Sequence, residues 1–182
     1  MFSTRCVWRR ISAIAGTSLP LTLLLVRYAP RAAANGTLMR ILVINGPNLN
    51  LLGTRRPEVY GTTTLVELEV DLIEFAEQRG ARVVCFQSNH EGALIDALHQ
   101  AIGRHDGVVV NFGAYSHTSR ALQDAIEAIE LPTVEVHISN IYEREEWRAT
   151  SFTAQACVHS IVGEGIAGYA HAVEYLLANH AP

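Results

Sequence analysis

Residues 40–60 read RILVINGPNLNLLGTRRPEVY, a short apolar run followed by a long polar connection. The run at 40–44 is rich in β-branched and aliphatic side chains, which predicts a buried strand. The connection lacks apolar periodicity, and connections longer than about 12–15 residues are uncommon in compact domains unless they are functional or disordered. Because asparagine, arginine and tyrosine side chains gather in it, we interpret it as an active-site lid.

Beyond this stretch, short β-branched runs alternate with amphipathic stretches, a pattern typical of a parallel sheet wrapped by helices. The expected strands are residues 40–44, 81–86, 107–111, 133–138 and 158–162. Five such βα units predict a single flavodoxin-like, doubly wound α/β domain with strand order 2-1-3-4-5.

Capping signals and apolar spacing place the helices. Thr64 with Glu67 predicts a capping box for the first helix, and Gly80 predicts its end. Ser88 with Glu91 predicts a second capping box. The two later helices are expected at residues 122–129 and 165–178, the earlier of them opened by the polar residues 116–119.

The charge composition excludes several functions. All 14 basic residues are arginine, so neither Schiff-base catalysis by a lysine nor a Walker-type phosphate site is expected. Residues 1–38 hold five arginines and no acidic residue, which leaves nine arginines against 18 acidic residues in the body. That acidic body makes nucleic acid an improbable partner. The three widely spaced cysteines suit buried free thiols in a reducing compartment.

Residues 1–38 are expected to be a leader outside the fold, with the catalytic domain at 39–182. Their apolar run at 11–26 is shorter than the ~20 residues of a membrane span and contains Pro20, so no stable membrane association is expected. Two origins stay open. A basic start with an apolar middle suits a signal peptide and export, whereas Met39 directly before the first strand suits an upstream start codon and a cytoplasmic protein.

Polar segments follow the first, third and fourth expected strands. In the order 2-1-3-4-5 these strands are neighbours, and ligands of such sheets bind beyond the carboxyl ends where the winding reverses. The segments read NGPNLN to RRPEVYG, NFGAYSHTS and HISNIYEREEWR. We therefore expect all three to line one cleft.

Tyr60 is the candidate base of that cleft. A phenol with an ordinary pKa near 10 is a weak base at neutral pH, and a nearby cation favours its ionised form. Arg55 or Arg56 would supply that cation. The alternative is a tyrosine that merely packs the lid against the body.

Histidines supply the candidate acid and anion site. His137 ends the fourth strand, where Glu135 on the same strand face would orient it and the amides of Ile138 and Ser139 would face a carboxylate. His117, after Asn111, lies where helix amides favour an anion. The alternatives are a structural histidine at 137, and capping by Ser116 or Thr118 with a solvated His117.

Two further patterns need an interpretation. Arg144 and Arg148 lie four apart in an expected short helix, so they would share a face and bind an acidic substrate, or pair with nearby acids. Residues 163–168 (GEGIAG) match GxGxxG, but too few residues follow for a dinucleotide site, so we attribute them to close helix–sheet packing. No metal-ligand spacing and no GxSxG motif is present.

Together these segments resemble the type II 3-dehydroquinate dehydratases, the class of dehydroquinase that uses neither a Schiff base nor a metal. The resemblance covers residues 39–178 and rests on the blocks VINGPNLNLLG, RRPEVYG, QSNHEG, NFGAYSHTS, LPTVEVHISNIYEREEWR and IVGEGIAGY. It implies dehydration of 3-dehydroquinate to 3-dehydroshikimate through an enolate, without a cofactor, in the shikimate pathway or in quinate breakdown.

The resemblance also implies roles for individual residues. Tyr60 matches the base, Arg55 the arginine that favours its ionised form, Asn48 the holder of a water near the enolate, and His137 the proton donor. The positions that match substrate-binding or associated residues are Asn111, His117, Ile138, Ser139, Arg148, the lid-associated Arg144, and Asp124, which the family supplies across a subunit contact. A homododecamer, built as a tetramer of trimers, is implied as well.

Two alternative functions remain open. A flavodoxin-like electron carrier would share the fold, but it would require a Ser/Thr-rich phosphate-binding loop where this chain has Asn-Gly-Pro-Asn. A catalytically silent member of the fold would serve as a scaffold or regulator.

Overall fold

A five-stranded parallel sheet forms the centre of the protein. The computed structural model describes residues 38–56 and 60–182. The strands are β1 (Met39–Asn45), β2 (Ala81–Gln87), β3 (Gly107–Asn111), β4 (Thr133–His137) and β5 (His159–Val162), each within one residue of its expected bounds. Their order is β2-β1-β3-β4-β5, which confirms the predicted flavodoxin-like topology of a single α/β domain.

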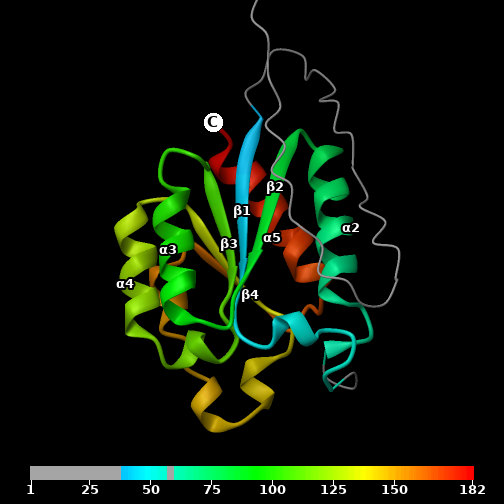
Figure 1. Ribbon diagram of the computed structural model, residues 1–182, viewed down its shortest axis with the longest axis vertical. Coiled ribbons are helices and arrows are strands. Elements are labelled where there is room, and N and C mark those ends of the chain that lie inside the picture. Colours follow the sequence, from blue (N-terminus) through cyan, green and yellow to red (C-terminus); the bar gives the residue numbers. More distant parts are fainter. Residues whose placement is uncertain (1–37, 57–59) are drawn as a thin grey trace, which may run out of the picture. The chain divides into compact units, whose positions relative to one another are not determined.

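Helices cover both faces of this sheet, as Figure 1 shows. On one face lie α2 (Leu65–Glu77) and α5 (Ala167–His180), and on the other lie α3 (Glu91–Ala101) and α4 (Arg120–Ile129). Side chains of β1 alternate between them, since Ile41 packs with α2 and α5 while Leu42 packs with α3 and α4. Each fully buried Val, Leu or Ile side chain stabilises such a core by about 1.5–3 kcal/mol.

One of the two predicted capping boxes is confirmed. The Thr64 side chain accepts a hydrogen bond from the Glu67 N–H, and the Glu67 carboxylate accepts one from the Thr64 N–H. The second prediction is wrong, because the N-cap of α3 is His90. The hydroxyl of Ser88 accepts a hydrogen bond from the His90 N–H at 3.0 Å, which forms a turn before the helix instead of capping it.

The helix expected to open at residues 116–119 begins later than predicted. Gly113–His117 forms the 3-10 helix η2, and α4 follows with Ser119 as its N-cap, whose hydroxyl accepts a hydrogen bond from the Leu122 N–H at 2.9 Å. The predicted caps Ser116 and Thr118 are therefore wrong. His117 lies in η2 and not in the first turn of α4.

Short 3-10 helices gather beyond the carboxyl ends of the strands, at the lower end of the sheet in Figure 1. They are η1 (Leu49–Leu51) after β1, η2 after β3, and η3 (Ile141–Glu143), η4 (Glu146–Arg148) and η5 (Thr153–Ala156) after β4. Asn45 and Asn111 pair in register where the winding of the sheet reverses. This edge is where a doubly wound sheet binds its ligands.

Two sequence predictions fall outside this description. Residues 1–37 of the expected leader and residues 57–59 of the expected lid lie outside the described residues. The domain boundary at Met39 therefore stays a prediction. Among the described helices, none is both long enough and apolar enough to cross a bilayer.

Candidate active site

One cavity lies beyond the carboxyl ends of β1, β3 and β4 and is open to solvent. The structure brings together there ten of the eleven predicted site residues, namely Asn48, Arg55, Tyr60, Asn111, His117, His137, Ile138, Ser139, Arg144 and Arg148. The exception is Asp124, which is exposed on α4 beside Arg120 and Glu127.

The turn that carries Asn48 is held tightly against the sheet. A Cβ atom added at Gly46 would lie 2.6 Å from the carbonyl oxygen of Phe112, so only glycine fits where β1 leaves the sheet. The Asn48 N–H donates to the side-chain oxygen of Asn89 at 2.9 Å, and Gln87 donates to the same oxygen at 3.1 Å. Asn48 itself adopts a left-handed conformation with φ 67°, which asparagine tolerates better than most residues.

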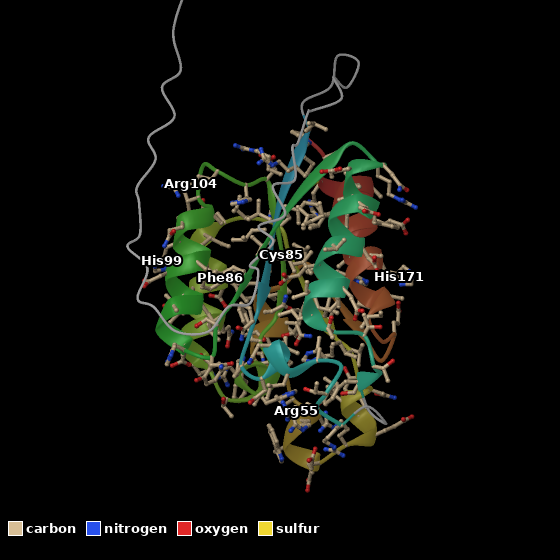
Figure 2. The ribbon with its side chains drawn as sticks, turned by 45° about the vertical axis from the view of Figure 1, so that its right-hand side comes forward. Arg55, Cys85, Phe86, His99, Arg104 and His171 are labelled. Atoms are coloured by element: carbon tan, nitrogen blue, oxygen red, sulfur yellow. The ribbon has the colours of Figure 1, made fainter. Side chains whose placement is uncertain are left out.

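Tyr60 lies between two arginines at the opposite end of the same connection. The guanidinium carbon of Arg55 lies 5.6 Å from the centre of the Tyr60 ring, and that of Arg144 lies 5.7 Å from it. The hydrogen bond to the Tyr60 hydroxyl comes from Arg144, whose Nη1 lies 2.8 Å away. The sequence suggested Arg55 or Arg56 for this role and gave no sign of the contact from Arg144, because Arg144 lies 84 residues further along the chain. Figure 2 shows Arg55 beside the segment that carries η3 and η4.

His137 and Glu135 form a buried pair at the end of β4. Nε2 of His137 lies 2.8 Å from Oε2 of Glu135, and both side chains are buried. Ser151 donates to the carboxylate at 3.0 Å, and Thr153 donates to it through a short hydrogen bond. Burial opposes ionisation of Glu135, but the hydrogen bond and charge of His137, with those two hydroxyls, outweigh it and hold the pKa of the carboxyl below its usual range.

His117 is buried beside His137. The ring centroids of the two histidines lie 5.5 Å apart in a stacked arrangement, and Trp147 contacts the His117 ring edge-on. Nδ1 of His117 lies 2.9 Å from the carbonyl oxygen of Thr150, so this nitrogen carries the hydrogen. Burial lowers the pKa of His117, and the charges of His137 and Arg148 lower it further.

The expected short helix with Arg144 and Arg148 on one face is wrong. Arg144 has an extended backbone between η3 and η4, while Arg148 ends η4. Both nevertheless line the cavity, and the carboxylate of Glu145 lies 2.6 Å from Nε of Arg148 and 3.6 Å from Nε of Arg144. With Arg55, three guanidinium groups line the cavity, and no acidic residue is among the described residues that line it.

The segment 150–153 supports the cavity residues but was not expected from the sequence. Its backbone fixes the tautomer of His117, and its hydroxyls Ser151 and Thr153 hold Glu135. Serine and threonine in a polar stretch give no periodic signal, so only their position after the arginine-rich segment could have suggested a role. No group of three metal-ligating side chains occurs in residues 38–56 and 60–182.

The cavity brings together a phenol contacted by a guanidinium and an imidazole beside a buried carboxylate. Side chains of these kinds can take and deliver protons. The fold and this site define an enzyme of the doubly wound α/β class.

Comparisons with known proteins identify the family. Residues 39–177 match the family described as Dehydroquinase class II. The chain is 56% identical over 142 residues to 3-dehydroquinate dehydratase from Ruegeria pomeroyi, covering 78% of this chain and 95% of that protein. It is 50% identical over 139 residues to catabolic 3-dehydroquinase 1 from Aspergillus terreus, covering 76% and 91% of the two chains.

A comparison with solved structures identifies the same family. The crystal structure of type II dehydroquinase from Butyrivibrio crossotus superposes with a TM-score of 0.76 and 45% identity, over 78% of this chain and 99% of that chain. This protein belongs to the class II dehydroquinase family, which confirms the resemblance seen in the sequence.

Proposed function

We propose that this protein dehydrates 3-dehydroquinate to 3-dehydroshikimate through an enolate, with Tyr60 as the base and His137 as the acid. The observation that carries the proposal is the meeting, in one cavity, of the Tyr60–Arg144 contact and the His137–Glu135 pair. Relatives named for this dehydration and for a catabolic dehydroquinase are both similar to this chain. The proposal therefore concerns the reaction that biosynthesis and quinate breakdown share.

The first step breaks a C–H bond beside the ketone. Tyr60, as its tyrosinate, takes the proton, and the electron pair moves onto the carbonyl oxygen as an enolate. Arg144, which donates to the Tyr60 hydroxyl, and Arg55, which lies over the Tyr60 ring, place positive charge beside this base. Asn48 would hold a water that stabilises the enolate oxygen.

The second step re-forms the carbonyl and expels the hydroxyl group on the β-carbon. His137 donates a proton to that oxygen, so it leaves as water and the conjugated enone remains. Nε2 of His137 lies 2.8 Å from Oε2 of Glu135, so the negative charge of the buried carboxylate lies beside the proposed proton donor.

The remaining cavity residues bind the substrate. Arg148, with the backbone of Ile138 and Ser139, would bind the carboxylate, since guanidinium and amide N–H groups both donate to carboxylate oxygens. Asn111 and His117 would bind hydroxyl groups of the ring. The surplus of arginine over acidic side chains around the cavity suits an anionic substrate.

We also propose that the working enzyme is a homododecamer built from four trimers. Asp124 then reaches the active site of a neighbouring subunit, which accounts for its exposed position on α4, away from the cavity of its own chain. Sedimentation of the purified protein tests this assembly. A monomer that is fully active would contradict it.

We further propose that residues 39–182 are the catalytic domain of a cytoplasmic enzyme and that Met39, rather than Met1, is the start of translation. The family match begins at residue 39. Mass spectrometry of the amino terminus of the protein from its native source tests this. A terminus upstream of Met39 would contradict it, and cleavage near residue 38 in an exported protein would favour the signal-peptide alternative.

The activity itself is tested by following the enone in the ultraviolet after the full chain is mixed with 3-dehydroquinate. Absorbance should rise, and borohydride added with substrate should not inactivate the protein, because it has no lysine to trap. No rise would contradict the enzyme and favour a silent member of the fold. A purified protein with a flavin spectrum would favour an electron carrier.

A further inference from the structure

A fully buried tyrosine lies directly behind the cavity. Tyr169 is the third residue of α5, and its side chain is 1% exposed. Its hydroxyl lies 2.6 Å from Oδ1 of Asn45 and 2.9 Å from Nδ2 of Asn111. These two asparagines are the paired last residues of β1 and β3, so the hydroxyl bridges the two strands where the sheet reverses its winding.

Three hydrogen bonds connect Gly113, Asn111, Tyr169 and Asn45, and the donor and acceptor of each can be assigned. The N–H of Gly113 can only donate, and it donates to Oδ1 of Asn111 at 3.2 Å. Nδ2 of Asn111 is therefore the end that faces Tyr169, and it donates to the phenolic oxygen. The phenolic hydrogen then goes to Oδ1 of Asn45. Burial raises the pKa of Tyr169 far above its usual range, so the phenol keeps the hydrogen that this order needs.

The consequence for the cavity lies at Asn111, which lines the cavity and is hydrogen-bonded to Tyr169 on its buried side. With one hydrogen of Nδ2 bound to Tyr169, a single N–H of the carboxamide is left to donate to a ligand. Without the Tyr169 hydroxyl, the buried hydrogen of Nδ2 would lose its acceptor, and the Gly113 N–H alone would hold the carboxamide in this orientation.

The GxGxxG motif explains how this tyrosine reaches its position. Gly168 precedes Tyr169, and a Cβ atom there would lie 3.2 Å from Ile161 and 3.3 Å from Val136. The missing side chain lets the start of α5 pack closely on β4 and β5. The motif thus serves helix–sheet packing, as the sequence predicted, and the packing delivers Tyr169 beneath the cavity.

We infer that Tyr169 is a positioning residue whose hydroxyl, together with the N–H of Gly113, holds the carboxamide of Asn111 so that one N–H is offered to a hydroxyl or carbonyl oxygen of the substrate. The inference rests on the proposed function, in which Asn111 binds the substrate ring. Tyr169 itself touches no reacting atom. Its contribution is to ligand binding, equally in the ground state and in the transition state.

The test is Tyr169→Phe, which removes the hydroxyl and keeps the ring in the core. We expect KM for 3-dehydroquinate to rise about tenfold, the effect of one lost hydrogen bond in a buried site, while kcat changes less than about threefold. In an Asn111→Ala background the same substitution should change KM less than about twofold, because its target is gone. A purely structural role would change KM equally in both backgrounds, and that result would overturn the inference.

The matched control is Tyr175→Phe, on the same helix, where the ring stacks on His159 with centroids 4.4 Å apart. It should leave KM unchanged. If Tyr169→Phe does not fold, as judged by its urea midpoint, Asn45→Ala replaces it, since it removes the acceptor that fixes the phenolic hydrogen. An unchanged KM in that variant would overturn the inference. If the wild-type protein shows no turnover, the proposed function is overturned, and this inference with it. If the wild type is active and Tyr169→Phe leaves KM unchanged, the inference alone is overturned.

Discussion

His137 ends a buried strand, whereas Tyr60 lies on the connection after β1 and is only partly buried. Glu135 is held by His137 on the same strand and by the hydroxyls of Ser151 and Thr153, from the connection between β4 and β5. The group that contacts the Tyr60 hydroxyl comes from a segment 84 residues away. The proposed acid is therefore anchored on a buried strand, while the proposed base depends on the meeting of two connections. Substitutions on the two sides should differ accordingly.

The largest effect is expected from Tyr60→Phe on the base side. Turnover should fall by about 10³, within the range for loss of a general base, while the affinity for quinate changes less than about twofold. Steady-state kinetics and calorimetry measure the two quantities. Tyr142→Phe is the matched control, because Tyr142 is an exposed tyrosine of η3 and should tolerate the change. Near-normal turnover by Tyr60→Phe would show that another group is the base.

On the acid side, Glu135→Gln should lower kcat by about 10², since the neutral amide removes the negative charge beside His137, the proposed proton donor. The loss is smaller than for Tyr60 because the proton donor itself remains. Glu143→Gln, at an exposed position of η3, serves as the control. A kcat within twofold of wild type would show that His137 does not depend on its buried partner.

The contact between the two connections is tested by Arg144→Gln. We expect kcat/KM to fall about 30-fold, the effect of losing one hydrogen bond from a charged group to Tyr60. The control is Arg104→Gln, which lies at the far end of the molecule from Arg55 in Figure 2. If Arg144→Gln were harmless and Arg55→Gln severe, Arg55 would be the cation that serves Tyr60 during turnover.

The smallest effect on turnover, about threefold, is expected from Thr153→Val, which mainly changes stability and its pH dependence. At pH 7 the loss of one hydrogen bond to the buried carboxylate should cost about 1.5–3 kcal/mol of unfolding free energy.

The sign of the pH effect follows from the lowered pKa of Glu135. A carboxyl with a lowered folded pKa stabilises the fold above its unfolded pKa, near 4.5, and loses that contribution as pH falls. Thr153→Val raises the folded pKa, so the gap in stability between wild type and variant should shrink below about pH 4.5. Urea unfolding between pH 7 and pH 3.5 measures it. A gap that is constant with pH would mean that Thr153 does not act through the charge of Glu135.

The sequence predicted most of the fold because local signals agree with it. Apolar runs placed each strand within one residue, and the polar segments after three of them identified the edge that holds the cavity. The failures were contacts between distant segments. Arg144 reaches Tyr60, and Thr153 reaches Glu135, only after the chain has folded. At Ser88 the capping rule chose the wrong residue, because a serine two positions before a helix can form a turn as well as a cap.

The stacked imidazoles of His117 and His137 influence which ligands the cavity can bind. Since the Thr150 carbonyl fixes the hydrogen on Nδ1 of His117, and burial keeps that ring uncharged near neutral pH, its Nε2 offers a lone pair to the cavity. In the proposed function, His117 would therefore accept a hydrogen bond from the ligand, while Asn111 would donate one. Replacing a ring hydroxyl with a methyl ether would leave that lone pair without a donor, so such analogues should bind poorly even though they fill the same space.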